Sequence, residues 1–181
     1  MMLRFGGVRL GKSPTFYGFP HCYRHRLSQI KIGDRVVLCS DSNFTALALN
    51  HAVKISTVRE GAHIVIGNDV GISGVCIVSA KEISIGSEVL IGANVLIVDT
   101  DFHPISPSNR RHSDDASKIM TAPVKVGNNV FIGANSIILK GVSIGDDSIV
   151  AAGSVVTSGE YPAGSILAGN PARQIGTVYS K

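Results

Sequence analysis

The sequence lacks tryptophan altogether, and aromatic residues fill only 6% of its 181 positions. Charged residues are also few, at 17%, whereas hydrophobic residues reach 44%. This balance excludes an intrinsically disordered chain and leaves enough apolar surface to bury a core. Because aromatic residues are scarce, that core must consist of aliphatic side chains. The length predicts a single domain.

Cysteine is scarce as well. The three cysteines, Cys22, Cys39 and Cys76, form no CxxC pair and no metal-ligand spacing, so we expect reduced thiols in a cytoplasmic protein. The first residues contain no continuous apolar run, which predicts neither a signal peptide nor membrane insertion. A net charge of +4 is too small and too dispersed to indicate nucleic acid, although it suits an anionic coenzyme. Two basic clusters, 24–26 and 110–112, are interpreted as solvated surface.

The sequence does contain a hydrophobic repeat with a period of six. Twelve register positions are all Ile or Val, although these two types supply only 40 of the 181 residues. This period fits neither a helix stripe nor a meander of hairpins. Short hexapeptide repeats predict a parallel β-helix, in which each repeat forms one side of a coil and its Ile or Val points inward. The positions are Ile66, Ile72, Val78, Ile85, Ile91, Ile97, Val126, Ile132, Ile138, Ile144, Val150 and Val156.

The segments around this repeat define the expected organisation. Residues 1–29 are rich in glycine, proline and aromatic residues, and we expect an arm across the outside or end of the coil, with a partly disordered leader as the alternative. Residues 30–160 form the β-helix. Within it, 98–125 lack the period and must leave the coil as a long loop. Residues 161–181 are expected to be an irregular cap and tail that cover the last coil.

Glycine often follows the inward residue of a repeat. We expect the chain to turn a corner at these positions, where a side chain would be crowded. They are Gly67, Gly86, Gly92, Gly127, Gly133 and Gly145.

His103 is the leading candidate for chemistry. It follows Asp99-Thr-Asp-Phe102 at the start of the long loop and precedes Pro104. Near neutral pH an imidazole can take the proton of a weakly nucleophilic group such as a hydroxyl and return it to a leaving group. From composition alone, a solvated loop histidine is the alternative.

At this point the sequence resembles the hexapeptide-repeat acyltransferases. The likeness covers about two thirds of the chain and is closest to the O-acetyltransferases of sugars and surface polysaccharides, including the maltose, galactoside and nodulation-factor enzymes. The residues that carry it are Asp99–Pro104, Val126–Ala134, Gly153–Thr157 and Ala168–Arg173.

The resemblance implies an all-β, left-handed parallel β-helix that assembles as a homotrimer. It also implies acetyl-CoA as co-substrate, a sugar or cell-surface polysaccharide precursor as acceptor, and His103 as the catalytic base. In this family the loop of one subunit helps to wall the site of its neighbour. The coenzyme lies in a groove between subunits and is held largely by backbone groups.

Five positions match the family's coenzyme contacts: Ala134, Ala152, Thr157, Ser158 and Arg173. The Ala134 amide is also a candidate oxyanion donor, and Arg173 matches a basic residue near the nucleotide phosphates. Relatives commonly have lysine where Ser158 stands, so one phosphate contact is missing or replaced. Repeat geometry explains the two alanines equally well, and a solvated tail arginine is the alternative for Arg173.

Several alternatives stay open. Asp99 and Asp101 either bind the acceptor or orient the His103 ring, or they cap turns of the loop. No metal is expected, because the zinc site of the carbonic anhydrase with this fold needs histidines closer together than His103 and His112. An N-acetyltransferase of an amino sugar nucleotide and a non-catalytic β-helix scaffold are the alternative functions.

Overall fold

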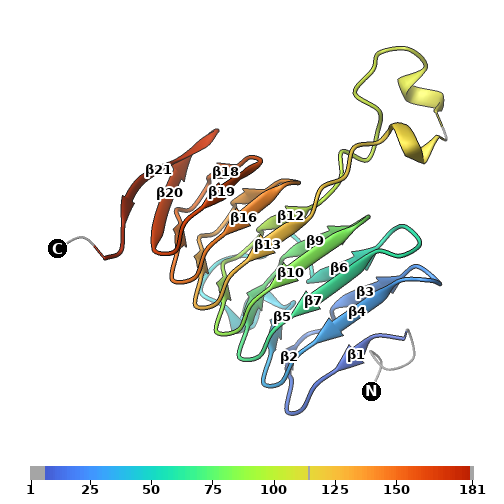
Figure 1. The fold of residues 1–181 in the computed structure, drawn as a ribbon. Helices are drawn as coiled ribbons and strands as arrows, with labels where there is room; N and C mark the ends of the chain where they lie inside the picture. Colours follow the sequence, from blue (N-terminus) through green and yellow to red (C-terminus); the bar gives the residue numbers. More distant parts are fainter. Residues whose placement is uncertain (1–6, 114, 180–181) are drawn as a thin grey trace.

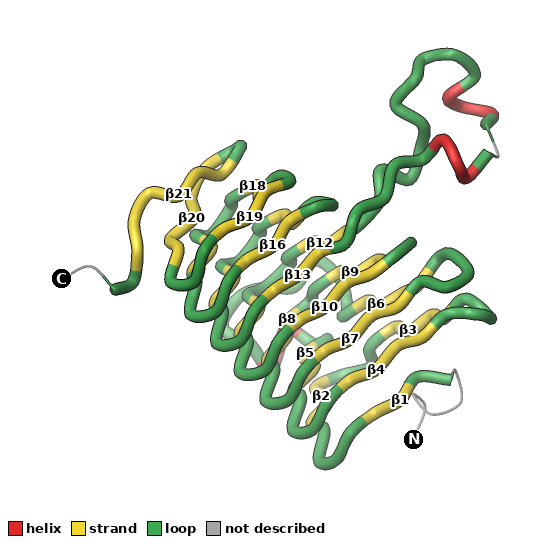
Figure 2. The backbone as a smooth tube through the Cα atoms, in the orientation of Figure 1, coloured by secondary structure: helices red, strands yellow, loops and turns green. Residues whose placement is uncertain are grey.

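The computed structural model describes residues 7–113 and 115–179 as a stack of coils (Figure 1). Each complete coil consists of three short strands, one in each of three sheets, which we name sheets A, B and C. The first coil lies at one end of the stack and the C-terminal strands at the other, and a single long segment projects from its side (Figures 1 and 2).

The strands of each sheet follow one another along the stack. Sheet A contains β1 (Arg9–Leu10), β4 (Gln29–Ile32), β7 (His63–Ile66), β10 (Glu82–Ile85), β13 (Val124–Val126), β16 (Val142–Ile144) and β19 (Gly159–Tyr161). Sheet B contains β2 (Thr15–Tyr17), β5 (Val37–Cys39), β8 (Gly71–Ser73), β11 (Leu90–Ile91), β14 (Phe131–Ile132), β17 (Ile149–Val150), β20 (Ser165–Gly169) and β21 (Ala172–Thr177). Sheet C contains β3 (His21–Arg24), β6 (Lys54–Thr57), β9 (Cys76–Ser79), β12 (Leu96–Val98), β15 (Ile137–Ile138) and β18 (Val155–Val156).

Successive coils pair in parallel, with equivalent residues opposite each other. Ile72, Ile91 and Ile132 are in register in sheet B, and Ile97 faces Ile138 in sheet C. All five side chains are buried, at 3% exposure or less. The six-residue period therefore arises because one residue of each side points inward and stacks on its equivalents above and below. This confirms the predicted parallel β-helix.

One of the twelve predicted register positions is wrong. In β9 the residue that stacks on Ile55 and Ile97 is Ile77, which is fully buried, and not Val78. Both residues are β-branched, so the sequence pattern did not distinguish them. A slip of one residue exchanges the inner and outer faces of a strand. The extra length of this coil lies in the turn between β9 and β10.

The corner glycines are crowded, as predicted. A Cβ on Gly67 would lie 2.5 Å from the carbonyl oxygen of Gly86, and a Cβ on Gly86 would lie 2.5 Å from that of Gly127. The left-handed backbone conformation falls two residues later, at Asp69 (φ 57°) and Glu88 (φ 61°). Glycine is thus required at 67 and 86 because neighbouring coils approach closely, and not because the backbone needs a positive φ.

The predicted arm is wrong for residues 9–24. These residues form β1, β2 and β3, which pair in parallel with β4, β5 and β6 as the first coil of the stack. Leu10, Phe16 and Cys22 pack against the core at the inward positions. They keep the spacing of six, but they are not Ile or Val. The predicted arm also included residues 1–6, which lie outside the described residues.

The C-terminal segment is more regular than expected. β19 and β20 continue sheets A and B beyond residue 160, with Tyr161 and Leu167 at inward positions. β21 then pairs antiparallel with β20. The prediction of an irregular cap is wrong here, because β21 forms an antiparallel hairpin with β20 at the end of the stack. Residues 180–181 of the predicted tail lie outside the described residues.

Two excursions leave the coils. The shorter one follows β5 and contains the 3-10 helix η2 (Ser42–Phe44). The longer one runs from the end of β12 at Val98 to the start of β13 at Val124, close to the predicted bounds 98–125, and contains η3 (Arg110–His112) and η4 (Ala116–Lys118). It projects away from the coils (Figure 2). We call residues 99–123 the long loop.

Candidate active site

The long loop leaves the stack through a narrow neck. Thr100 and Thr121 form an antiparallel bridge, the Asp101 amide donates to the Met120 carbonyl at 3.1 Å, and the Ala122 amide donates to the Asp99 carbonyl at 3.0 Å. The two ends of the loop are therefore held together by backbone hydrogen bonds. The residues just beyond the neck have a fixed position relative to the coils.

Asp99 anchors this neck to the coil below. Its side chain is fully buried. It accepts hydrogen bonds from Ser79 Oγ at 2.7 Å and from the amides of Ala80, Lys81 and Glu82 at 2.6–2.9 Å. An acceptor hydroxyl could reach it only by displacing these bonds, so the structure removes Asp99 from the candidate substrate contacts and from the candidates for orienting His103. Its role is to cap the turn between β9 and β10.

Asp101 is paired across the neck with Lys140. Lys140 Nζ lies 2.7 Å from Asp101 Oδ1, and each side chain is about one quarter exposed. Asp101 Oδ2 is buried and has no hydrogen-bond partner among the described residues. Lys140 lies in the turn after β15, so this ion pair ties the root of the loop to the following coil. The sequence analysis missed Lys140, because 39 positions separate it from Asp101 and nothing in its own surroundings marks it.

The backbone turns sharply before His103. The His103 amide donates to the Asp101 carbonyl at 2.7 Å, and Phe102 between them has a φ of 61°. Such a two-residue hydrogen bond with a positive φ at a residue other than glycine is a strained turn, which the neck holds in place. Pro104 is buried, whereas the His103 side chain is exposed. No hydrogen bond reaches the His103 ring from the described part of the chain, so both ring nitrogens are available to a ligand.

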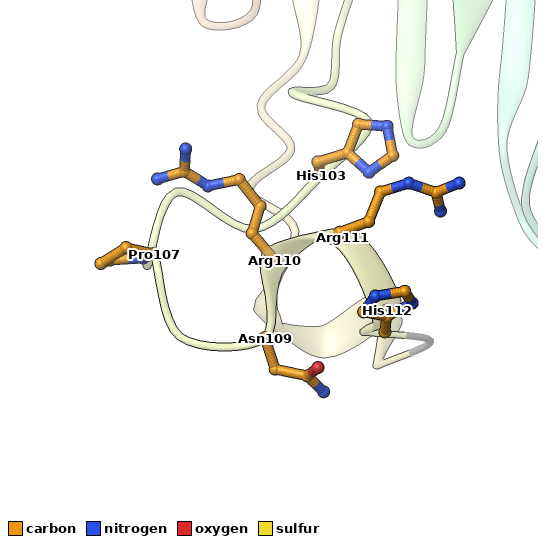
Figure 3. A pocket seen from close by; sticks show the side chains of 6 residues that line it. All are labelled: His103, Pro107, Asn109, Arg110, Arg111 and His112. Atoms are coloured by element: carbon orange, nitrogen blue, oxygen red, sulfur yellow. The ribbon is translucent and has the colours of Figure 1, made fainter.

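His103 lies beside a hollow in the long loop (Figure 3). We call it the loop hollow. Its volume is about 470 Å³, within the usual range for small-molecule sites. It is lined by His103, Pro107, Asn109, Arg110, Arg111 and His112. The last three residues, interpreted from the sequence as solvated surface, thus share a cavity with the candidate base.

The five predicted coenzyme contacts lie on different edges of the stack. Ala134 and Ala152 occupy successive turns from sheet B to sheet C, which we call the B–C edge, and the Gly153 amide donates to the Ala134 carbonyl at 2.9 Å. Thr157 and Ser158 lie in the turn from sheet C to sheet A, the C–A edge, where Ser158 Oγ donates to the Gly141 carbonyl at 3.3 Å.

The long loop also leaves at the C–A edge, between β12 in sheet C and β13 in sheet A. His103 therefore shares an edge with Thr157 and Ser158, while Ala134 and Ala152 lie across sheet C. Arg173 is exposed in β21, at the end of sheet B. One chain alone does not bring the five residues and His103 together.

Other chemistries find little support. The three cysteines are free thiols, and burial raises the pKa of Cys22 to about 11, so its nucleophilic thiolate is scarce at neutral pH. Burial also raises the pKa of Cys76. Within the described ranges, no three His, Cys, Asp or Glu side chains are grouped closely enough to hold a metal ion. In the same ranges, no helix has the length and apolar character needed to cross a membrane.

Known proteins resemble this chain in both sequence and fold. Residues 123–158 match the family model described as hexapeptide repeat of succinyl-transferase. The galactoside O-acetyltransferase of Escherichia coli is 38% identical over 99 residues, which are 55% of this chain and 46% of the relative. The chain is thus similar to hexapeptide-repeat acetyltransferases of the sugar O-acetyltransferase type over about half of its length. It spans about half the length of this curated relative.

Two further comparisons find similarity to N-acyltransferases. The 2,3,4,5-tetrahydropyridine-2,6-dicarboxylate N-acetyltransferase of Staphylococcus aureus is 50% identical over 54 residues, 30% of this chain and 22% of the relative. A variant of AntD, an N-acyltransferase from Bacillus cereus solved with dTDP and coenzyme A, aligns with a TM-score of 0.70. That alignment has 20% identity and covers 97% of this chain and 87% of that one, so it bears on the fold alone. The left-handed β-helix predicted for the hexapeptide-repeat protein is confirmed.

Proposed function

We propose that this hexapeptide-repeat protein transfers an acetyl group from acetyl-CoA to a hydroxyl of a sugar or cell-surface polysaccharide precursor, in the cytoplasm. The observation that carries the proposal is the placement of His103. His103 is exposed, its ring has no hydrogen-bond partner among the described residues, and it borders a hollow of about 470 Å³ on a loop whose two ends are joined by backbone hydrogen bonds. The similarity to the galactoside O-acetyltransferase supports a sugar acceptor.

His103 supplies the proton transfers that the reaction needs. Its neutral imidazole accepts the proton of the acceptor hydroxyl as the oxygen attacks the thioester carbonyl. The resulting imidazolium then gives that proton to the sulfur as the carbon–sulfur bond breaks, so the products are the acetyl ester and free coenzyme A. General base catalysis of this kind contributes about 10²–10⁴-fold to the rate.

We propose that Ala134, Ala152, Thr157, Ser158 and Arg173 hold the coenzyme. The Ala134 amide takes no hydrogen-bond partner within the described part of the chain, which suits a donor to the oxyanion that develops during transfer. Since His103 and Ala134 lie on different edges of one chain, a complete site requires the C–A edge of one subunit to face the B–C edge of another. The site is therefore proposed to lie between subunits.

The outer surface of sheet B supports assembly into a homotrimer. A row of outward-facing residues crosses it in register, with Leu90 59% exposed and Phe131 47% exposed. Ile149 and Ile166 extend the row on one side, and on the other side Gly71 separates Leu90 from Val37. An apolar row of this kind favours contact with another subunit, since monomers rarely expose large continuous apolar patches. The matching row of sheet A contains Lys31 and Lys125 and is more polar.

Transfer to a nitrogen is the second candidate. It is favoured by the similarity to the Staphylococcus aureus N-acetyltransferase and by the fold shared with AntD. The same base and coenzyme site would serve it. A non-catalytic scaffold is disfavoured, because a scaffold needs neither a strained turn at His103 nor a hollow beside it.

The test is the release of free thiol from acetyl-CoA with a panel of sugars and amino sugars. We expect acceptor-dependent release that falls by about 10²–10⁴-fold in His103→Ala, because the base is removed. His51→Ala removes a histidine that does not line the hollow, and as the matched control it should keep the wild-type activity. Calorimetric binding of coenzyme A should be the same in both variants.

Each other outcome has a definite meaning. Full activity in His103→Ala would refute the assignment of the base. If the wild-type protein binds no coenzyme A, the acyltransferase proposal fails and the scaffold is favoured. If only amino sugars promote release, the acceptor atom is nitrogen.

A further inference from the structure

The loop hollow is lined by two permanent cations and two histidines. Besides His103, its lining includes Arg110, Arg111 and His112, and no carboxylate of the described residues lines it. In Figure 3 the two guanidinium groups extend on either side of the His103 ring. The candidate base and two permanent cations therefore face the same cavity.

The three carboxylates of the long loop whose positions the structure describes are engaged elsewhere. Asp99 is buried in the neck, and Asp101 is paired with Lys140. Asp115 accepts hydrogen bonds from Ser117 and lies 3.4 Å from Lys118. Among the residues with described positions, neither Arg110 nor Arg111 forms a salt bridge. No carboxylate of the described ranges neutralises these two charges, which makes them available to a ligand.

The local backbone places these two arginines in the lining of the hollow. Asn109 adopts a left-handed conformation, with a φ of 55°, and starts the short helix η3 that carries both arginines. Arg110 Nη2 donates to the Ile105 carbonyl oxygen, which ties the guanidinium across the loop. An arginine that is already tethered loses less conformational freedom when it binds a ligand.

We propose that the acceptor carries a phosphate or diphosphate group, which Arg110 and Arg111 bind while His103 faces the hydroxyl to be acetylated. Guanidinium groups bind phosphate oxygens with paired hydrogen bonds, and two of them match a dianionic group better than a single carboxylate. A hollow of about 470 Å³ is large enough for a phosphorylated monosaccharide. This inference rests on the proposed acetyltransferase function and narrows its acceptor class.

The same chemistry could come from a sugar 1-phosphate or from a nucleoside diphosphate sugar. Both present a phosphoryl group on the anomeric oxygen of the sugar. We therefore compare three acceptors: glucose 1-phosphate, UDP-glucose and the neutral methyl glucoside. The same three forms of galactose are tested in parallel. The comparison shows whether the protein uses a sugar 1-phosphate, a nucleoside diphosphate sugar or a neutral sugar. Glucuronic acid tests whether a carboxylate suffices.

The experiment measures kcat/KM for each acceptor in the wild type and in Arg110→Gln, Arg111→Gln and the double variant. We expect the wild type to prefer a phosphorylated sugar over its neutral counterpart by at least about tenfold, and the double variant to lose this preference, because each charged hydrogen bond contributes about 10–100-fold. Lys118→Gln removes a loop cation that is paired with Asp115 outside the hollow, and it should change nothing. The KM for acetyl-CoA should stay constant throughout.

Three results would overturn the inference. The first is equal use of neutral and phosphorylated sugars by the wild type. The second is a rise in the KM for acetyl-CoA, with that for the acceptor unchanged, in the double variant, which would assign the arginines to the coenzyme phosphates. The third is a phosphate preference that survives the double substitution.

Direct binding separates this inference from the proposed function. Calorimetric titration of His103→Ala with the same phosphorylated sugars needs no turnover, and the double arginine substitution in that background should abolish the signal. If no acceptor promotes thiol release but this arginine-dependent binding is present, the proposed reaction fails while the phosphate site stands. If thiol release occurs but no phosphorylated sugar binds, the reaction stands and the phosphate site fails.

Discussion

At the residue scale, the fold depends on a few positions where neighbouring coils nearly touch. Gly86 lies between Gly67 and Gly127 in the adjacent coils, and each of these contacts leaves no room for a Cβ. Beside these glycines a ladder of polar side chains accepts the corner amides: Asn68 Oδ1 binds the Asp34 amide at 2.8 Å, and Asn128 Oδ1 binds the Ser87 amide at 2.9 Å. Close packing and satisfied amides therefore coincide at the same corner.

Gly86→Ala should destabilise the protein by about 1–3 kcal/mol, because the new methyl group meets backbone rather than a movable side chain. Chemical denaturation of the variant and the wild type measures the difference. Gly176→Ala is the matched control: its Cβ would lie 3.8 Å from Ile166 Cδ1, an ordinary contact, and it should be nearly neutral. If both variants unfold at the wild-type denaturant concentration, the coils can separate at the corner and close approach does not explain the glycine.

The residue-scale features differ in how far the sequence predicts them. The corner glycines and most inward residues were predicted correctly, because a period of six is a local signal. The roles of Asp99 and Lys140 were not, since each depends on a contact with another coil. Asp99 binds backbone amides of residues 80–82, and Lys140 reaches Asp101. The spacing of residues along the chain does not by itself predict contacts between coils, because the length of every turn decides which residues of neighbouring coils lie side by side.

At the element scale, the long loop is an addition to the coils and not a part of their core. The buried hydrophobic cluster, as far as the structure describes it, draws no member from residues 99–123. The neck hydrogen bonds between 99–101 and 120–122 close the loop before its distal part begins. Stability and the proposed chemistry should therefore be separable in this protein.

Excision of residues 102–119, with Asp101 joined to Met120 through Asn-Gly, should leave the coils folded and abolish acetyl transfer. A two-residue Asn-Gly turn suits the antiparallel neck. Circular dichroism and thermal unfolding should stay close to the wild type, while acceptor-dependent thiol release should fall to background. Loss of cooperative unfolding would mean that the loop stabilises the stack, and retained transfer would remove His103 and the loop hollow from the proposed site.

The elements at the two ends of the stack were the hardest to predict. Leu10, Phe16 and Cys22 keep the period of six but depart from Ile and Val, and the first coil was interpreted as an arm for that reason. The last coil departs in the same way at Tyr161 and Leu167. An end coil is covered on one side only, so its inward positions accept larger or more polar residues than the middle coils do.

At the scale of the whole molecule, the proposed base and the proposed coenzyme contacts Ala134 and Ala152 lie on different edges of the stack. His103 stands at the C–A edge, while Ala134 and Ala152 stand at the B–C edge, across sheet C. In the proposed homotrimer, the C–A edge of each subunit would lie against the B–C edge of the next. Every site would then contain residues from two chains. The apolar row of sheet B, with Leu90 and Phe131, supplies surface for such contacts.

Complementation between two inactive variants tests this arrangement. His103→Ala removes the proposed base, and Ala134→Trp fills the proposed coenzyme groove of the other edge. Each variant alone should be inactive. Co-expressed in equal amounts, they should recover about a quarter of the wild-type activity, because random mixing places an intact His103 opposite an intact Ala134 in one interface of four.

The controls make the result specific to the subunit interface. Separately purified variants that are mixed without subunit exchange should remain inactive, and a double variant with both changes in one chain should show no recovery when it is co-expressed with either single variant. Sedimentation should show the same assembly for all of them. If the co-expressed variants form mixed assemblies of the wild-type size but remain inactive, His103 and Ala134 belong to a site within one subunit or to unrelated sites. Sedimentation of the wild type as a monomer would refute the homotrimer, and with it a site built from the C–A edge of one subunit and the B–C edge of the next.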